Sequence, residues 1–250
     1  MTSSFMISSL WHALVYQPLF NLLILIIGIL PGHSVGFAII LLTVIVKIAL
    51  FPLTGKSILA QHAMKELEPH LKDLREKHAD DKQALAQKTM ELYQEKGVSP
   101  FSGCLPMLIQ IPIVFGLYWV FFKGLPVVDA KMLYSFVQHP GVLYMQFLSF
   151  DLLKKSLVLA LLTAFTQYIQ ARLSLKRQPA LPKSEGNKPS FQEDFAKSMQ
   201  LQMVYVLPVM IGAIAYHLPS AVALYWTTSN ILGIGQEFLV SRKLRELAKK

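Results

Sequence analysis

The sequence predicts an all-α integral membrane protein with a core of five transmembrane helices, an N-terminal interfacial helix and a cytosolic helical hairpin. Hydrophobic residues make up 53% of the 250 residues and charged residues only 16%, and the mean hydropathy is +0.44. A soluble domain of this length would carry more charge on its surface. The apolar residues also gather in blocks, with lysine and arginine mostly between and after them, which is typical of membrane spans joined by loops.

Five apolar blocks approach the length needed to cross a membrane, which is about 20 residues of helix. The third block is the shortest, and Leu152 and Leu153 extend it if the two lysines that follow reach out to the interface. Pro219 and Ser220 predict a tight turn between the last two blocks. The expected spans are 35–53, 103–122, 152–173, 200–218 and 219–240.

The N-terminal segment 1–34 predicts an extracytoplasmic N-terminus with an amphipathic helix that lies in the membrane interface. Its apolar run, Leu19–Leu30, would be about 18 Å long as a helix, which is too short to span. Pro18 opens the run and a Pro-Gly pair closes it, while Trp11 and Tyr16 are suited to anchoring at the interface. A sixth span over the same residues is the alternative.

The distribution of basic residues predicts the orientation of the chain. Segments 54–102 and 172–200 and the tail after Ser241 carry eight, six and five lysines or arginines, whereas segment 123–155 carries four. Because basic loops stay on the cytosolic side, the N-terminus is expected outside and the C-terminus in the cytosol. The expected connections are an extracytoplasmic loop at 123–151, a cytosolic loop at 174–199 and a basic cytosolic tail at 241–250.

Segment 54–102 predicts the cytosolic helical hairpin. Its apolar residues recur every three to four positions in two stretches, which is the spacing of one helix face. Asp80 and Asp81 stand between the two stretches and can cap the second helix, while Gly97 suits its end. Pro69 is expected to kink the first helix.

Lys47 lies inside the first expected span, about 9 Å from its cytosolic end. Its long side chain could reach back toward the interface, which is one interpretation. The other is that Lys47 faces a hydrated cavity, because a lysine deep in a span costs about 2.5–3.5 kcal/mol and is usually kept for a function. Thr43 lies one turn earlier on the same face.

Polar residues also interrupt the other spans. Hydrogen bonds between helices could explain any one of them. All of them together with a lysine favour a shared polar pocket that carries a positive charge, since Glu237, near a cytosolic end, is the only carboxylate in the expected spans. The candidate groove residues are Lys47, Thr43, Gln110, Gln167, Gln170, Tyr225, Trp226 and Asn230.

The sequence predicts no enzyme, no catalytic residue and no cofactor or metal. His62, His70 and His78 are eight residues apart, whereas metal ligands on one helix face are three or four apart. Phosphate-loop, nucleophile-elbow and metalloprotease motifs are missing from the sequence. The alternative function is a small solute transporter or channel that uses the same polar residues.

Several stretches between about Trp11 and Leu244 resemble the YidC family of membrane protein insertases, which has mitochondrial oxidase-assembly and thylakoid albino relatives. The resemblance is carried by YQPLFNLL, LFPLTGKS, DDKQALAQKTMELYQEKGVSPFSGCLPMLIQIPIVFGLYWVF and PSAVALYWTTSNILGIGQ. It implies a non-enzymatic insertase and folding chaperone in the bacterial plasma membrane. The large extracytoplasmic domain that many Gram-negative members have is missing from this sequence.

The resemblance also implies a hydrophilic groove that opens to the cytosol and to lipid. Lys47 matches the single basic residue of the groove, which is usually an arginine, and Thr43, Gln167 and Trp226 match lining positions, while Gln110 falls in the motif of the second span. The expected partners are nascent membrane proteins, the lipid bilayer and the ribosome, which the hairpin and the tail would contact. The protein would work either together with the Sec translocon or without it.

Overall fold

The computed structural model describes residues 9–78, 81–99, 105–125, 127–175 and 198–247. The chain divides into two compact units. The first comprises Met1–Leu50, Met107–Gln167 and Pro208–Gly233, and the second comprises Phe51–Pro106, Tyr168–Leu207 and Ile234–Lys250.

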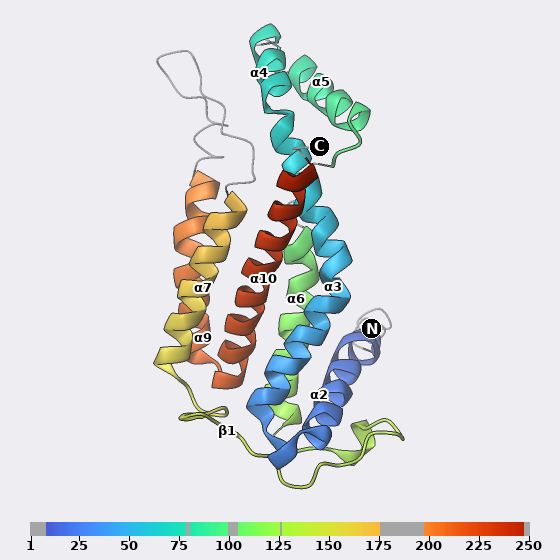
Figure 1. Cartoon of the computed structure of the whole chain (residues 1–250), viewed down its shortest axis with the longest axis vertical. Coiled ribbons are helices and arrows are strands. Elements are labelled where there is room, and N and C mark those ends of the chain that lie inside the picture. Colours follow the sequence, from blue (N-terminus) through green and yellow to red (C-terminus); the bar gives the residue numbers. More distant parts are fainter. Residues whose placement is uncertain (1–8, 79–80, 100–104, 126, 176–197, 248–250) are drawn as a thin grey trace, which may run out of the picture. The chain divides into compact units, whose positions relative to one another are not determined.

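Helices form most of the described structure, as expected (Figure 1). The long helices are α2 (Gln17–Ile29), α3 (Val35–Glu66), α4 (Glu68–Lys77), α5 (Lys82–Glu95), α6 (Leu105–Trp119), α7 (Leu157–Leu175), α9 (Leu207–His217) and α10 (Ser220–Leu247). Three π turns, η1 (His12–Tyr16), η4 (Val120–Gly124) and η6 (Gln202–Val206), adjoin α2, α6 and α9. The other described elements are two 3-10 turns, η2 (Pro31–His33) and η5 (Ala130–Met132), and a hairpin of β1 (Gln146–Phe147) with β2 (Phe150–Asp151).

The described residues contain three helices that are long and apolar enough to cross a membrane: Ser9–Ile29, Val35–Glu66 and Ser198–His217. A shorter apolar helix runs over Leu108–Gly124. A mostly helical membrane protein is therefore confirmed, but a core of five spans is not. The expected third and fifth spans correspond to α7 and α10, whose threonine, glutamine and asparagine side chains lower their hydropathy.

The N-terminal helix is longer than the sequence predicted. It runs from Ser9 through the π turn η1 and α2 to Ile29, and its 21 residues are enough to span. The segment is therefore not too short to span, contrary to the expectation from the sequence. Pro18 does not open the helix, since the wide π turn directly before it accommodates the missing N–H group, as happens in membrane helices.

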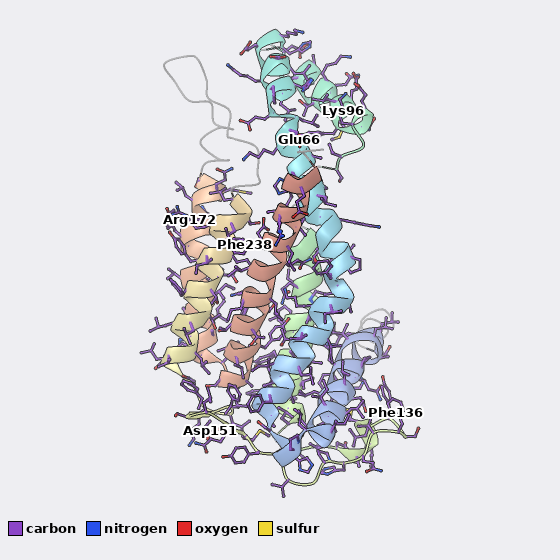
Figure 2. The ribbon with its side chains drawn as sticks, viewed as in Figure 1. Glu66, Lys96, Phe136, Asp151, Arg172 and Phe238 are labelled. Carbon is purple, nitrogen blue, oxygen red and sulfur yellow. The ribbon has the colours of Figure 1, made fainter. Side chains whose placement is uncertain are left out.

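In the second unit, the first helix of the charged hairpin is continuous with α3 up to Glu66 (Figure 2). Pro52 lies inside this helix, and the buried Gln236 amide donates hydrogen bonds to the Phe51 carbonyl and the Thr54 hydroxyl beside it. The helix ends before Leu67, whereas the sequence predicted a kink at Pro69. Pro69 sits in the first turn of α4, where a proline is tolerated because that turn has no N–H partners to lose.

Asp81 caps the N-terminus of α5, where its Oδ1 accepts hydrogen bonds from the backbone N–H groups of Gln83 (3.0 Å) and Ala84 (2.9 Å). Asp80, the other predicted cap, lies outside the described residues. The helix ends before Gly97, whose φ of +64° favours glycine, as the sequence predicted.

We expect Asp81→Ala to destabilise α5 by about 1 kcal/mol, because it leaves two backbone N–H groups without their acceptor. Amide hydrogen exchange over residues 82–86 should become faster, by roughly fivefold for a change of that size. Exchange in α4 serves as the internal control and should stay unchanged. Equal exchange in both helices of the variant and the parent would contradict the assignment of the cap.

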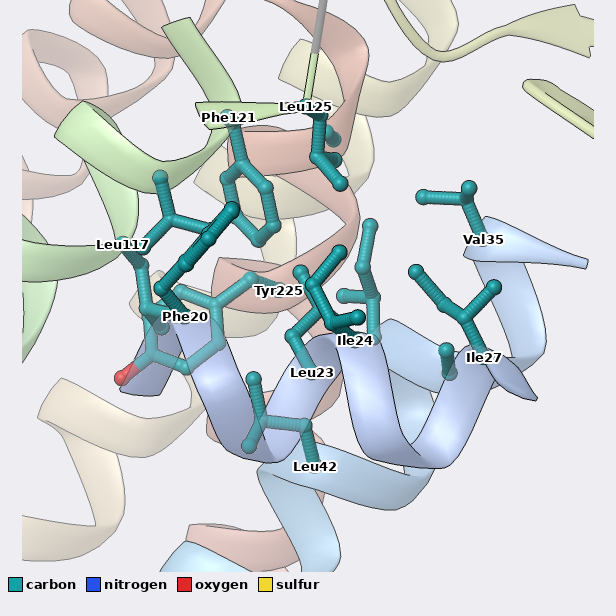
Figure 3. Packing of buried hydrophobic residues seen from close by; sticks show 14 of the residues in the cluster. Phe20, Leu23, Ile24, Ile27, Val35, Leu42, Leu117, Phe121, Leu125 and Tyr225 are labelled. Atoms are coloured by element: carbon teal, nitrogen blue, oxygen red, sulfur yellow. The ribbon is translucent and has the colours of Figure 1, made fainter. Parts of the chain in front are cut away.

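The core of the first unit packs α2 against α3, α6, η4 and α10 (Figure 3). In a bilayer this packing stabilises by close van der Waals contact, because lipid tails are as apolar as the side chains that leave them. Its fully buried members include Phe20, Leu23, Ile24 and Ile27 from α2, Val35 and Leu42 from α3, Leu117 and Phe121 from α6 and η4, and Tyr225 from α10.

A loop of residues 125–156 follows η4 in the first unit, and the buried Asn21 of α2 holds part of it. The Asn21 Nδ2 donates to the Met132 carbonyl (2.9 Å), and its Oδ1 accepts from the backbone N–H of Tyr134 (2.7 Å). Gln17 donates a longer hydrogen bond of 3.3 Å to the same Met132 carbonyl. One amide in the middle of an apolar helix thus replaces the strand or helix partners that this loop lacks.

Backbone hydrogen bonds fix the rest of the loop. Val35 at the start of α3 donates to the Tyr144 carbonyl, and Tyr144 donates to the His33 carbonyl, both at 3.1 Å. Ser220 begins α10 as expected, and its N–H and hydroxyl donate to the Lys154 carbonyl at 2.8 and 2.6 Å. The first turn of α10 therefore gains the acceptors that helix N-termini require.

Candidate functional site

The Lys47 side chain lies half-buried on α3 in the first unit. Among the described residues, no hydrogen bond or ion pair joins its ammonium to another side chain. The acidic residues of the first unit are Asp129 and Asp151, and both lie in the loop. Lys47 thus brings a positive charge into an apolar helix without a described carboxylate to neutralise it.

Both loop carboxylates have partners close by. The Asp129 Oδ1 accepts from the backbone N–H of Lys131 at 2.9 Å. Asp151 accepts from the backbone N–H of Leu153 at 3.0 Å and lies 3.2 Å from the Lys154 ammonium. The Leu153 N–H and then Lys154 lower the pKa of the Asp151 carboxyl below its usual value, so these contacts weaken only as the pH falls through that lowered pKa.

Thr43 lies one helical turn before Lys47 and is buried. Its hydroxyl donates to the Ile39 carbonyl of its own helix at 2.6 Å. A hydroxyl that is satisfied within its own helix can sit among apolar neighbours at little cost. Thr43 and Lys47 share a face, as the spacing predicted, but no described contact joins their side chains.

Gln110 and Tyr225 come together as a pair. The Gln110 Nε2 donates to the Tyr225 hydroxyl at 2.7 Å, which links α6 to α10. Tyr225 is fully buried and Gln110 is half-buried, and among the described residues no other hydrogen bond uses the Gln110 amide.

We expect Tyr225→Phe to lower the free energy of unfolding by about 1 kcal/mol, because it removes the acceptor of Gln110 and keeps the ring. Thermal unfolding in detergent measures the change. Tyr216→Phe on α9 is the matched control, because Tyr216 is partly exposed and no described hydrogen bond uses its hydroxyl. Equal destabilisation by the two variants would exclude a specific role for the pair.

Asn230 joins α10 to α7. Its Nδ2 donates to the Thr166 hydroxyl at 3.1 Å, and both side chains are buried. One turn away, the Thr163 and Thr227 hydroxyls lie 2.9 Å apart, and the Thr163 hydroxyl also donates to the Ala223 carbonyl at 3.1 Å. These hydrogen bonds join the two helices, so Asn230 stabilises the packing of α7 against α10.

The remaining candidates are half-buried and make no described side-chain hydrogen bonds: Gln167, Gln170 and Trp226. Gln167 and Trp226 belong to the first unit, and Gln170 belongs to the second.

Sequence reasoning left Thr163, Thr166 and Thr227 out of the candidate set, although they form the polar contacts between α7 and α10. The available signal was their helical spacing, since Thr163 lies four residues before Gln167, Thr166 four before Gln170 and Thr227 three before Asn230. Asn21 was missed as well, and a single amide inside the run NLLILII was its signal.

The comparison with known protein families covers nearly the whole chain. The family described as 60Kd inner membrane protein matches residues 26–247. The chain is also 31% identical to the membrane protein insertase YidC of Oceanobacillus iheyensis over 246 residues, which cover 96% of this chain and 86% of the relative. The chain belongs to the YidC family of membrane protein insertases. YidC proteins insert membrane proteins and are not enzymes, so both expectations from the sequence are confirmed at the level of the family.

Individual YidC relatives differ in length. The relative from Oceanobacillus iheyensis is covered to 86% of its length, whereas two others are much longer than this chain. The chain is 33% identical to YidC of Laribacter hongkongensis and 35% identical to YidC of Francisella tularensis subsp. novicida. The chain spans only 38% and 34% of those two longer relatives.

Proposed function

We propose that the chain inserts nascent membrane proteins by taking their polar tails into a hydrated groove among its helices and releasing their apolar segments into lipid. The half-buried Lys47, which no described carboxylate neutralises, carries this proposal. A charge in that position needs water or a transient anion beside it. Acidic residues in the tail of a client would supply such an anion.

The physical problem of insertion is desolvation. Moving charged side chains and unpaired backbone groups across hydrocarbon costs several kcal/mol for each group. A groove that reaches partway across the membrane removes part of that path. As the apolar segment of the client leaves the groove, burial in lipid favours its release by about 25 cal/mol per Å².

The uncharged polar groups of Gln110, Gln167 and Trp226, all in the first unit, are suited to brief contacts with a moving chain. None of them carries a charge, and each can form hydrogen bonds: the indole of Trp226 has one N–H donor, and a glutamine amide has two N–H donors and an acceptor oxygen. Weak contacts of this kind hold a polar tail long enough to pass and do not trap it. Tyr225, Asn230 and Thr43 would shape the groove, since their hydrogen bonds are already made within the protein.

The proposed orientation has the N-terminus outside and the C-terminus in the cytosol, which follows from the excess of lysine and arginine in segments 54–102 and 172–200 and in the tail. In this orientation the charged hairpin of α4 and α5 faces the cytosol. It and the basic tail would meet the ribosome and incoming clients, either without the Sec translocon or beside it.

Photo-crosslinking to a stalled nascent membrane protein tests the groove. A photoreactive residue at Trp226 or Gln110 should crosslink to the client. The same residue at Ile231 is the matched control, because Ile231 lies on α10 with an exposed apolar side chain that would face lipid. Equal crosslinking from Trp226 and Ile231 would argue against a groove on that face.

Reconstituted vesicles separate insertion from transport. The purified chain should insert a short client into vesicles that stay impermeable to small solutes. Solute flux without insertion would instead support a transporter or channel.

A further inference from the structure

The loop of residues 125–156 contains a hairpin with an unusual tip. Strands β1 and β2 pair with Gln146 opposite Asp151 and Phe147 opposite Phe150, which leaves Leu148 and Ser149 as the turn (Figure 2 labels Asp151). Leu148 has a φ of +53° and is 77% exposed. Glycine or asparagine is favoured at such a position, and a leucine there is both strained and poorly solvated in water.

The hairpin continues a lipid-facing surface of α3. Phe147 packs onto Gly36, where a Cβ would overlap the phenyl ring, and meets Phe37 edge-on with 5.2 Å between ring centroids. Phe37 begins a stripe on α3, and the exposed members of that stripe follow one face of the helix. They are Phe37, Leu41, Ile45 and Ile48. Because α3 is a candidate span, this stripe lies against acyl chains.

An open pocket of about 410 Å³ lies at the junction of the hairpin and α3. The residues that line it include Phe37, Tyr144, Phe147 and Leu148 beside the polar Ser34 and Gln146, and through Phe37 the pocket adjoins the lipid-facing stripe. Lys154 and Lys155 follow the hairpin and are exposed, and Lys154 contacts Asp151 at 3.2 Å. The surface is thus apolar at the tip and basic behind it, which matches the acyl chains and phosphates of a phospholipid leaflet.

We propose that this hairpin is a membrane anchor: Leu148 enters the adjacent leaflet at the boundary between headgroups and acyl chains, and a phospholipid acyl chain occupies the pocket beside it. The apolar environment compensates for the exposure of Leu148, and the hairpin in turn holds the N-terminal end of α3 at a fixed depth. The anchor is independent of the groove, because none of its residues belongs to the candidate groove residues.

Spin-label accessibility tests the depth of the tip. A nitroxide is attached to a cysteine at position 148, in a Cys104→Ser background, in vesicles of phosphatidylglycerol and phosphatidylethanolamine. Oxygen should relax this label several-fold more than a water-soluble nickel chelate does. A label at Gln138, an exposed polar position of the same loop, should show the opposite preference. A preference for the nickel chelate at position 148 would overturn the proposal.

Leu148→Asn gives a second test, because it should change the order of the hairpin in opposite directions with and without lipid contact. Asparagine relieves the backbone strain, so without lipid contact the hairpin should become more ordered. With lipid contact it loses its anchor, and amide exchange at Phe147 and Phe150 in vesicles should be several-fold faster than in the parent. Equal or slower exchange would refute the anchor. Dipolar broadening of the spectrum of the label at position 148, if it disappears on dilution with unlabelled chain, would mean that the tip contacts a second copy of the chain. That result would also refute the anchor.

Discussion

Lys47→Ala should lower the insertion of clients with acidic outer tails by roughly tenfold. A carboxylate that passes within about 10 Å of the ammonium, at an effective dielectric constant near 20, gains about 1.5 kcal/mol, and this is the attraction that the variant loses. Lys47→Met should behave the same way, because it keeps most of the length of the side chain and removes only the charge. Protease protection of a radiolabelled client in vesicles measures the change.

Two controls isolate the charge. Lys47→Arg should be tolerated, since it restores the cation, although its planar group donates differently. A client whose outer tail has been neutralised should insert equally well with the parent and with Lys47→Ala. If the acidic client also inserts equally well with both, attraction by Lys47 is not part of the mechanism and the polar side chains around the groove remain to explain it.

Asn21→Ala should lower the free energy of unfolding by about 2 kcal/mol. It leaves the backbone N–H of Tyr134 without its acceptor and removes the 2.9 Å hydrogen bond to the Met132 carbonyl, and a polar group that loses its partner in a buried site costs about 1–3 kcal/mol. Thermal unfolding in detergent measures the loss. Limited proteolysis should also cut between residues 127 and 137 sooner than in the parent.

Gln17→Ala is the matched control for Asn21, because Gln17 donates to the same carbonyl over a longer distance of 3.3 Å. Its effect should stay below about 0.5 kcal/mol, since Asn21 continues to satisfy Met132. Comparable losses in the two variants would mean that the loop is held mainly by its other contacts, at Val35 and Ser220.

The sequence predicted the helices better than it predicted which of them resemble membrane spans. The apolar blocks predicted helices where α3, α6, α7, α9 and α10 lie, but α3 continues 13 residues and α10 seven residues beyond the expected spans. Where the predicted bounds differ from the structure, the difference has a physical reason. The apolar window ends at Leu53, whereas the helix continues through charged residues to Glu66, and the Gln236 amide bonds to the Phe51 carbonyl and the Thr54 hydroxyl on either side of Pro52.

The candidate residues were predictable as polar positions but not as contacts. Helical spacing places Thr43 and Lys47 on one face, and the structure agrees. Spacing cannot show that Gln110 would meet Tyr225, 115 positions away, because that contact depends on how α6 and α10 pack. Asn230 illustrates the same limit, since its neighbour Thr166 became visible only through the pairing of α7 with α10.

The three π turns bear on how this chain can change in length. Each one, at His12–Tyr16, Val120–Gly124 and Gln202–Val206, holds one residue more than the α-helical turn it replaces. Loss of one residue there would leave an unbroken α-helix, whereas the same deletion inside α10 would rotate every later side chain by about 100°. Single-residue gaps between homologous chains are therefore expected to collect at these three turns.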